Sequence, residues 1–228
     1  MEKYTTQFNS FFWIEDKPSQ YSDIYLQKSK KYLRFISFLP WLEFVWVGNS
    51  IWLWYANKNS DIDLFVVTSP NMLWFVRFFM TLYFQILWLR KNKNKHAWRF
   101  CLSFFMTSRS LNFWPFLIEN DIYMYFWIKN LKVIIDNSNI SERIISENKD
   151  NFKLQDIKLN RDYILPRNKL SRLKFNTFNN IIKKVFYKRT YNKYLELWKP
   201  FWITITEDIL KFHNNDKRKT IRNNIEMI

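Results

Sequence analysis

Two aspartates separated by one residue, Asp61 and Asp63, stand at the start of the apolar run DIDLFVVT. Side chains alternate along a strand, so both carboxylates are expected on the same face. Adjacent carboxylates repel each other, and burying them without a partner is costly. A divalent cation resolves both problems, because Mg²⁺ is commonly held by one or two carboxylates together with substrate phosphates. The pair therefore indicates Mg²⁺-dependent chemistry on phosphates, with a solvent-exposed strand end as the alternative.

The only glycine of the chain lies shortly upstream, in Gly48-Asn49-Ser50, directly after the short apolar run EFVWV. A glycine and a small hydroxyl residue at such a turn allow backbone N–H groups and the hydroxyl to approach a phosphate. The stretch between Ser50 and Asp61 is long enough for about two helical turns and a return to the neighbouring strand. The spacing thus predicts a phosphate loop beside the two aspartates.

This arrangement resembles the nucleotidyltransferase superfamily of the DNA polymerase β type, whose signature is Gly-Ser, a short helix and Asp-x-Asp on the next strand. The likeness is closer to bacterial nucleotidyltransferase-domain proteins and extends over residues 32–221, through the segments VGNS, NSDIDLFVVT, LWFVR, RFCLSFFMT and LKFHNNDKRKTI. It implies that Asp61 and Asp63 bind one or two Mg²⁺ ions. It also implies that Gly48, Asn49 and Ser50 hold the phosphates of a nucleoside triphosphate such as ATP, whose nucleotidyl group passes to an unidentified acceptor, with nucleic acid among the candidates.

A third carboxylate of that superfamily usually lies on the following core strand. This chain has no Asp or Glu between Asp63 and Glu119. Glu43, Glu119 or Asp121 would complete the site only if the fold brings one of them to the pair. The second hypothesis is therefore a catalytically degenerate member that binds nucleotide or nucleic acid without turnover.

Composition narrows the class of partner. The chain has 228 residues, of which 48% are hydrophobic and 21% aromatic, and this excludes an intrinsically disordered protein. Its net charge of +16 favours nucleic acid, nucleotides or anionic lipid as partners, although an AT-rich genome explains the abundance of lysine equally well. No acidic residue occurs in residues 163–195, where a solvated helix face and a nucleic-acid surface are both open interpretations.

The sequence gives little sign of export. The single cysteine, Cys101, excludes an internal disulfide and a cysteine-rich zinc site. No apolar leader is visible at the N-terminus, so a cytoplasmic protein is expected. The apolar stretch of residues 72–89 has the length of a membrane span, but Arg77 and Gln85 interrupt it, and a helix packed on a sheet explains it better. No membrane partner is expected.

The expected fold class is α+β, a small mixed β-sheet core with flanking helices and a helical C-terminal region. We divide the chain into an N-terminal segment and helix (residues 1–40), a nucleotidyltransferase core (residues 41–110) and a basic helical region (residues 111–228). Periodicity and turn residues predict helices over residues 22–38, 72–90, 122–135, 141–149 and 171–197, and strands over residues 43–47, 61–68 and 99–107.

Twelve tryptophans accompany one glycine, whereas glycine averages about 7% of residues in proteins. Some bacterial lineages read the UGA codon as glycine and others read it as tryptophan. We therefore hypothesise that several tryptophans are UGA glycine codons rendered as Trp. The candidates are positions where similar proteins carry glycine: Trp54, Trp88, Trp98, Trp198 and Trp202. A genuinely tryptophan-rich protein is the alternative.

Overall fold

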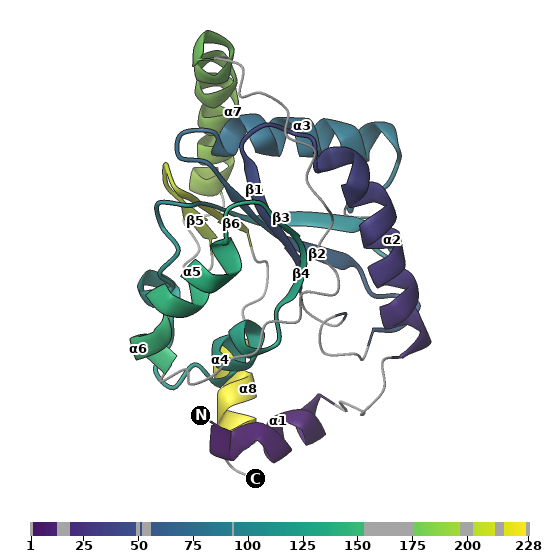
Figure 1. Ribbon diagram of the computed structural model, residues 1–228, viewed down its shortest axis with the longest axis vertical. Helices are drawn as coiled ribbons and strands as arrows, with labels where there is room; N and C mark the ends of the chain where they lie inside the picture. Colours follow the sequence, from purple (N-terminus) through teal and green to yellow (C-terminus); the bar gives the residue numbers. More distant parts are fainter. Residues whose placement is uncertain are drawn as a thin grey trace.

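A six-stranded mixed sheet forms the centre of the molecule, with helices on both faces (Figure 1). The computed structural model describes residues 2–12, 19–48, 51, 56–92, 94–152, 176–196, 203–212 and 217–226. The elements are η1 (Glu2–Tyr4), α1 (Thr5–Phe11), α2 (Gln20–Ile36), β1 (Leu42–Val47), β2 (Ile62–Thr68), α3 (Leu73–Ile86), β3 (Phe100–Thr107), η3 (Trp114–Phe116), α4 (Ile122–Lys129), β4 (Lys132–Asp136), α5 (Ile140–Glu147), α6 (Lys149–Phe152), α7 (Asn176–Glu196), β5 (Ile203–Ile205), β6 (Ile209–Phe212) and α8 (Arg218–Glu226).

The strands lie in the order β4-β1-β2-β3-β6-β5. β2 and β3 are parallel and are connected through α3, while the other neighbouring strands are antiparallel. The register places Val47 opposite Leu64 and Asp63 opposite Cys101. The C-terminal end of β1 and the N-terminal ends of β2 and β3 therefore lie next to one another at the same end of the strands.

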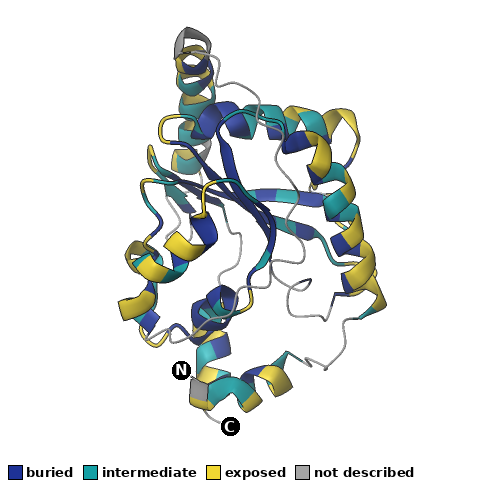
Figure 2. Cartoon of the chain, viewed as in Figure 1, coloured by how far each residue is buried: buried dark blue, intermediate teal, exposed yellow. Residues whose placement is uncertain are grey.

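Each face of the sheet has its own hydrophobic core. On one face, Leu64 and Val66 of β2 pack with residues of α2 and α3, and Ile182 of α7 joins them. On the other face, Phe65 and Val67 pack with residues of α4, α5, α8 and α1. This division follows from the alternation of side chains along β2. Figure 2 shows the strands as the most continuously buried part of the chain.

The expected class, α+β with a mixed sheet and flanking helices, is confirmed. The predicted strands and the predicted helices of residues 22–38, 72–90 and 141–149 are present with shifted ends. Residues 132–136 form strand β4, so the prediction of one helix over residues 122–135 is wrong there. The C-terminal region is also not wholly helical, because β4, β5 and β6 all belong to the sheet.

The apolar helix α3 packs against the sheet, and Trp74, Val76 and Met80 are among its buried residues. None of the described helices combines the length and apolar character that a bilayer-spanning segment needs. α3 ends four residues earlier than predicted, in a left-handed C-terminal cap. The N–H of Leu89 donates to the carbonyl of Phe84, and the N–H of Trp88 donates to that of Gln85, which is the Schellman pattern.

Three tryptophans adopt a backbone conformation that favours glycine. Trp88 follows the C-cap of α3 with φ 56°, the position where glycine is commonest. Trp41 has φ 64° in the turn Leu39-Pro40-Trp41-Leu42, and Trp98 has φ 53° in a turn closed by the N–H of Arg99. A positive φ at the third residue of a turn is the type II requirement for glycine. The hypothesis that glycine codons were translated as Trp gains physical support at Trp88 and Trp98. Trp41, which was not among the candidates, has the same type of backbone conformation. Trp54, Trp198 and Trp202 lie outside the described residues.

Candidate carboxylate site

Asp61 and Asp63 lie side by side where β2 begins, and both are partly exposed. Ile62 and Leu64 belong to the core beneath α3, so alternation turns the two carboxylates toward the opposite face. An oxygen of each carboxylate and the Sγ atom of Cys101 all lie within 4.8 Å of one another. The predicted pairing of the two aspartates on one face is therefore present.

Cys101 occupies the place on the following strand where the resemblance leads one to expect a third carboxylate, because it pairs with Asp63 across β2 and β3. Burial, and then the charge of Asp63, raises the pKa of its thiol above the ordinary range. The thiol stays protonated at neutral pH and adds no negative charge. In the sequence Cys101 is one residue of the predicted strand over residues 99–107, and only its register against Asp63 brings it to the site.

Lys91 supplies the positive charge of the site. Its Nζ atom lies 2.5 Å from Oδ2 of Asp61, in a partly exposed ion pair. Burial alone would lower the pKa of Lys91, but the acidic groups around it, Cys101, Asp61 and Asp63, raise it above the ordinary value. Since the Cys101 thiol is protonated, the two aspartates are the groups that keep Lys91 charged. Lys91 belongs to the basic turn that follows the predicted helix of residues 72–90, and nothing in the local sequence links it to Asp61.

Gly48 lies directly beside this site. Its backbone N–H donates to the carbonyl of Asp63 over 2.8 Å, and its φ is not in the left-handed region. A Cβ at this position would lie 3.4 Å from Nε1 of Trp127, an ordinary contact. The N–H of Gly48 is thus committed to the sheet, and Asn49 and Ser50, the other predicted phosphate ligands, lie outside the described residues.

Two indole rings lie behind Gly48. Trp46 and Trp127 pack with ring centroids 3.9 Å apart. A Cβ on Gly48 would be 3.4 Å from Nε1 of Trp127 and 3.6 Å from Nε1 of Trp46. Trp46 is fully buried, and its N–H has no acceptor within the described part of the chain. A buried donor without a partner is costly, and this one lies beneath Gly48, the first residue of the predicted phosphate loop.

The other acidic candidates do not reach the pair. Glu43 lies at the far end of β1, where its carboxylate accepts a hydrogen bond from Ser69. Asp121 caps the N-terminus of α4 and forms an ion pair with Arg218. Glu119 is exposed and precedes that cap. Among the described residues, the only cluster of three potential metal ligands is Asp61, Asp63 and Cys101.

The donor set fits a hard divalent cation in part. Carboxylate oxygens are the ligands that Mg²⁺ and Mn²⁺ prefer, and two of them with substrate phosphates are enough. A protonated thiol is a poor ligand for such ions. Lys91 competes with any cation for Asp61. The site therefore has two hard ligands and an internal counter-charge.

Comparisons with family models, with curated proteins and with solved structures find no match to this chain. The geometry of the carboxylate site is therefore the observation that bears on function.

Proposed function

We propose that the protein is a Mg²⁺-dependent nucleotidyltransferase that moves a nucleotidyl group from a nucleoside triphosphate to an acceptor hydroxyl. The observation that supports this proposal is the position of Asp61 and Asp63. Their carboxylates share one face at the start of β2, and the N–H of Gly48, the first residue of the predicted phosphate loop, is bonded to Asp63. The predicted loop therefore begins, at Gly48, next to the strand residues that carry the two carboxylates.

In such a transfer, the acceptor hydroxyl attacks the α-phosphorus, the new P–O bond replaces the bond to pyrophosphate, and the hydroxyl proton passes to water. Asp61 and Asp63 would hold the divalent ion, which when bound neutralises charge on the phosphates. Lys91 would release Asp61 as the carboxylate takes up the ion, and its ammonium would then be available to a phosphate oxygen.

The test is incubation of the protein with Mg²⁺, labelled nucleoside triphosphates and separate cellular pools of RNA, protein and small molecules. A labelled product identifies the acceptor class. We expect Asp63→Asn to lower turnover by roughly 10²-fold or more, the loss typical of removing one charge-stabilising group. Circular dichroism and the thermal midpoint should stay near those of the unmodified chain, because Asp63 is partly exposed.

The matched control is Asp23→Asn, an exposed aspartate in the first turn of α2. It removes the same charge away from the site and should leave turnover unchanged. Equal turnover of Asp63→Asn and the unmodified chain would refute the assignment of the metal ligands. Absence of labelled product from every pool would refute the enzymatic proposal.

A second candidate function is nucleotide binding without turnover. It is favoured by two groups at the site, the Lys91 ammonium on Asp61 and the protonated thiol of Cys101 where a carboxylate is expected. This candidate predicts that ATP binds with similar affinity in EDTA and in Mg²⁺. An ATP affinity that depends strongly on Mg²⁺, together with a labelled product, would support the enzymatic function over binding without turnover.

A further inference from the structure

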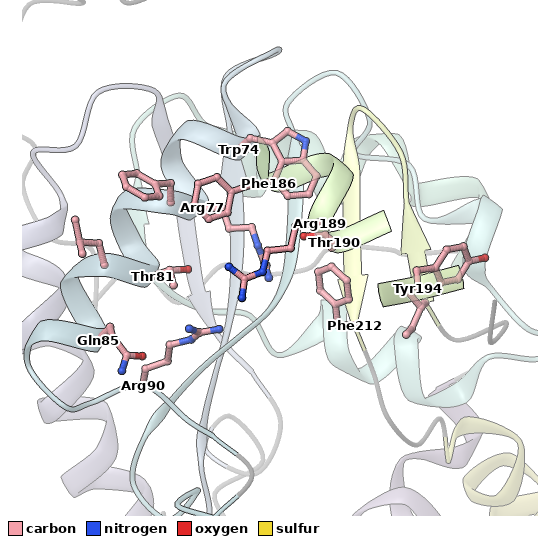
Figure 3. Close-up of a pocket in the computed structure, with 13 residues that line it drawn as sticks. Trp74, Arg77, Thr81, Gln85, Arg90, Phe186, Arg189, Thr190, Tyr194 and Phe212 are labelled. Atoms are coloured by element: carbon pink, nitrogen blue, oxygen red, sulfur yellow. The ribbon is translucent and has the colours of Figure 1, made fainter. Parts of the chain in front are cut away.

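A cavity lies on the other face of the sheet, between α3, α7 and the strand pair β5–β6. Its volume is about 570 Å³, within the range of small-molecule sites. Three arginines line it, Arg77 and Arg90 from α3 and the segment after it, and Arg189 from α7. In Figure 3 the guanidinium groups of these arginines are directed to the same part of the cavity.

The arginines of this cavity have no acidic partner among the described residues. The described lining contains no Asp or Glu. Among the described residues, no carboxylate forms an ion pair with Arg77, Arg90 or Arg189. Three positive charges that meet in one cavity repel one another and favour an anion.

Arg77 lies deepest of the three. Its Nη1 atom donates to the carbonyl of Leu102 over 3.0 Å, and its guanidinium lies 4.8 Å from the ring centroid of Phe212. Burial, and then the neighbouring charge of Arg90, lowers the pKa of Arg77 to about 10. The group remains charged at neutral pH, so its lost hydration is a cost that a bound anion would offset.

The remaining polar groups of the cavity are also donors or mixed groups. Thr81, Gln85 and Thr190 add hydroxyl and amide groups. The cavity therefore offers an excess of donors over acceptors. A phosphate group, with several acceptor oxygens and a charge near −2, matches this excess.

The rest of the described lining is apolar and mostly aromatic, with the rings of Trp74, Phe78, Phe186, Tyr194 and Phe212 beside Leu82 and Ile203. Aromatic faces bind flat rings by stacking, at about 1–3 kcal/mol per base in nucleic-acid complexes. We propose that this cavity binds a small phosphate monoester whose organic part carries a flat ring, with the phosphate at the arginines and the ring against the aromatic side chains.

This site is separate from the carboxylate site. Arg77 lies over the ring of Phe105, in the core beneath α3, whereas Asp63 points to the other face of the sheet. The two sites are adjacent through the sheet: Arg77 is electrostatically coupled to Cys101, and Arg90, which lines the cavity, precedes Lys91, which forms the ion pair with Asp61. The inference therefore adds a site to the proposed function and does not depend on it.

A nucleic-acid strand is the less favoured occupant. Exposed lysines of α7 such as Lys184 and Lys188 lie outside the cavity, and Lys183 is already paired with Glu207. The converging charges belong to the cavity, whose volume suits one mononucleotide-sized molecule. A ligand confined to the cavity would be insensitive to changes at Lys184 and Lys188.

The experiment is calorimetric titration of the full chain in EDTA with AMP, adenosine and ribose 5-phosphate. AMP should bind, and the two fragments should each bind at least about tenfold more weakly, because one lacks the phosphate and the other the ring. The double variant Arg90→Gln/Arg189→Gln should lose at least about tenfold in AMP affinity. Both positions are exposed, so the variant should fold.

The control is Lys184→Gln/Lys188→Gln, which removes the same charge from α7 outside the cavity and should leave AMP affinity unchanged. Asp63→Asn should also leave it unchanged, which separates this site from the proposed catalytic one. The proposal is overturned if AMP does not bind in EDTA, or if the arginine variant binds it as well as the unmodified chain. Equal losses in the arginine and lysine variants would overturn it in favour of a diffuse basic surface.

Discussion

On the face of the sheet covered by α4, the carboxylates of Asp61 and Asp63 meet the ammonium of Lys91 within the protein. On the face covered by α3 and α7, no carboxylate of the described residues lines the cavity or forms an ion pair with Arg77 or Arg90. The first site can exist without a ligand at low electrostatic cost. The second one carries an excess of like charge, and this is where a ligand's own charge is most needed.

A shared feature makes the difference sharper. Beside each site lies a buried indole N–H that has no acceptor among the described residues, in Trp46 below Gly48 and in Trp74 at the arginine cavity. The two sites differ in their balance of charge, so changes of charge should affect them in different ways.

The largest expected effect concerns the thiol of Cys101. Burial and Asp63 raise its pKa, so the thiolate fraction at pH 8 is lower in the folded chain than in the denatured one. We expect iodoacetamide to alkylate the folded protein at least about tenfold more slowly, with the rate still rising at pH values where the denatured protein has levelled off. The chain has one cysteine, so intact mass reports this site alone.

The same reaction separates the two faces. AMP bound in the arginine cavity should leave the alkylation rate unchanged, because Cys101 points to the opposite side of the sheet. Equal rates in folded and denatured protein would mean that the thiol is not held protonated, and would restore it as a third anionic group beside Asp61 and Asp63.

A smaller effect is expected from removing the internal counter-charge. Lys91→Met removes the ammonium partner of Asp61 and so increases the net negative charge of the carboxylate site. We expect Mn²⁺ to bind about fivefold more tightly, the equivalent of one partly exposed ion pair. Titration followed by the electron paramagnetic resonance of free Mn²⁺ measures this affinity directly.

The control for this variant is Lys95→Met, in the same basic turn, where Lys95 is exposed and has no ion pair with a described residue. It should leave Mn²⁺ affinity as it was. If Lys91→Met and the unmodified chain bind Mn²⁺ equally, the ion pair does not compete with the metal. AMP affinity in EDTA should be the same in all three proteins.

Local signals were enough to predict the centre of the fold. The β-branched run after Asp61 and the alternation of Asp61 and Asp63 predicted β2 and its two carboxylates. The same signals failed at residues 132–136, because a short apolar run without flanking turn-forming residues fits a buried helix as well as a strand. Asn130 was the only break, and the pairing of β4 with β1 decided the outcome.

Long-range pairing also explains which site residues were missed. Lys91 lies 30 residues from Asp61 along the chain, and no local pattern links them. Arg77 was interpreted only as an interruption of an apolar stretch, and Arg189 only as one charge of a basic run. Their convergence requires α7 to pack on α3, which periodicity within either helix does not specify.

The smallest expected effect concerns Trp88, in the segment that supplies Arg90 to one site and Lys91 to the other. Its φ of 56° is costly for a bulky residue, by about 1–2 kcal/mol, whereas glycine adopts it freely but loses roughly 0.5–1 kcal/mol through its greater freedom when unfolded. Trp88 is 77% exposed and so loses little burial. Trp88→Gly should therefore raise the free energy of unfolding by about 0.5–1 kcal/mol, measured from urea unfolding curves.

The matched control is Trp114→Gly. Trp114 is 70% exposed and does not have a positive φ, so glycine there relieves no strain and should lower the free energy of unfolding by roughly 0.5–1 kcal/mol. A stabilised Trp88→Gly beside a destabilised Trp114→Gly would show that the backbone at residue 88 is built for glycine, as the hypothesis of rendered glycine codons requires. If both variants are destabilised alike, Trp88 is compatible with its cap. The segment that links the two sites would then need no glycine, and the composition would be that of a genuinely tryptophan-rich protein.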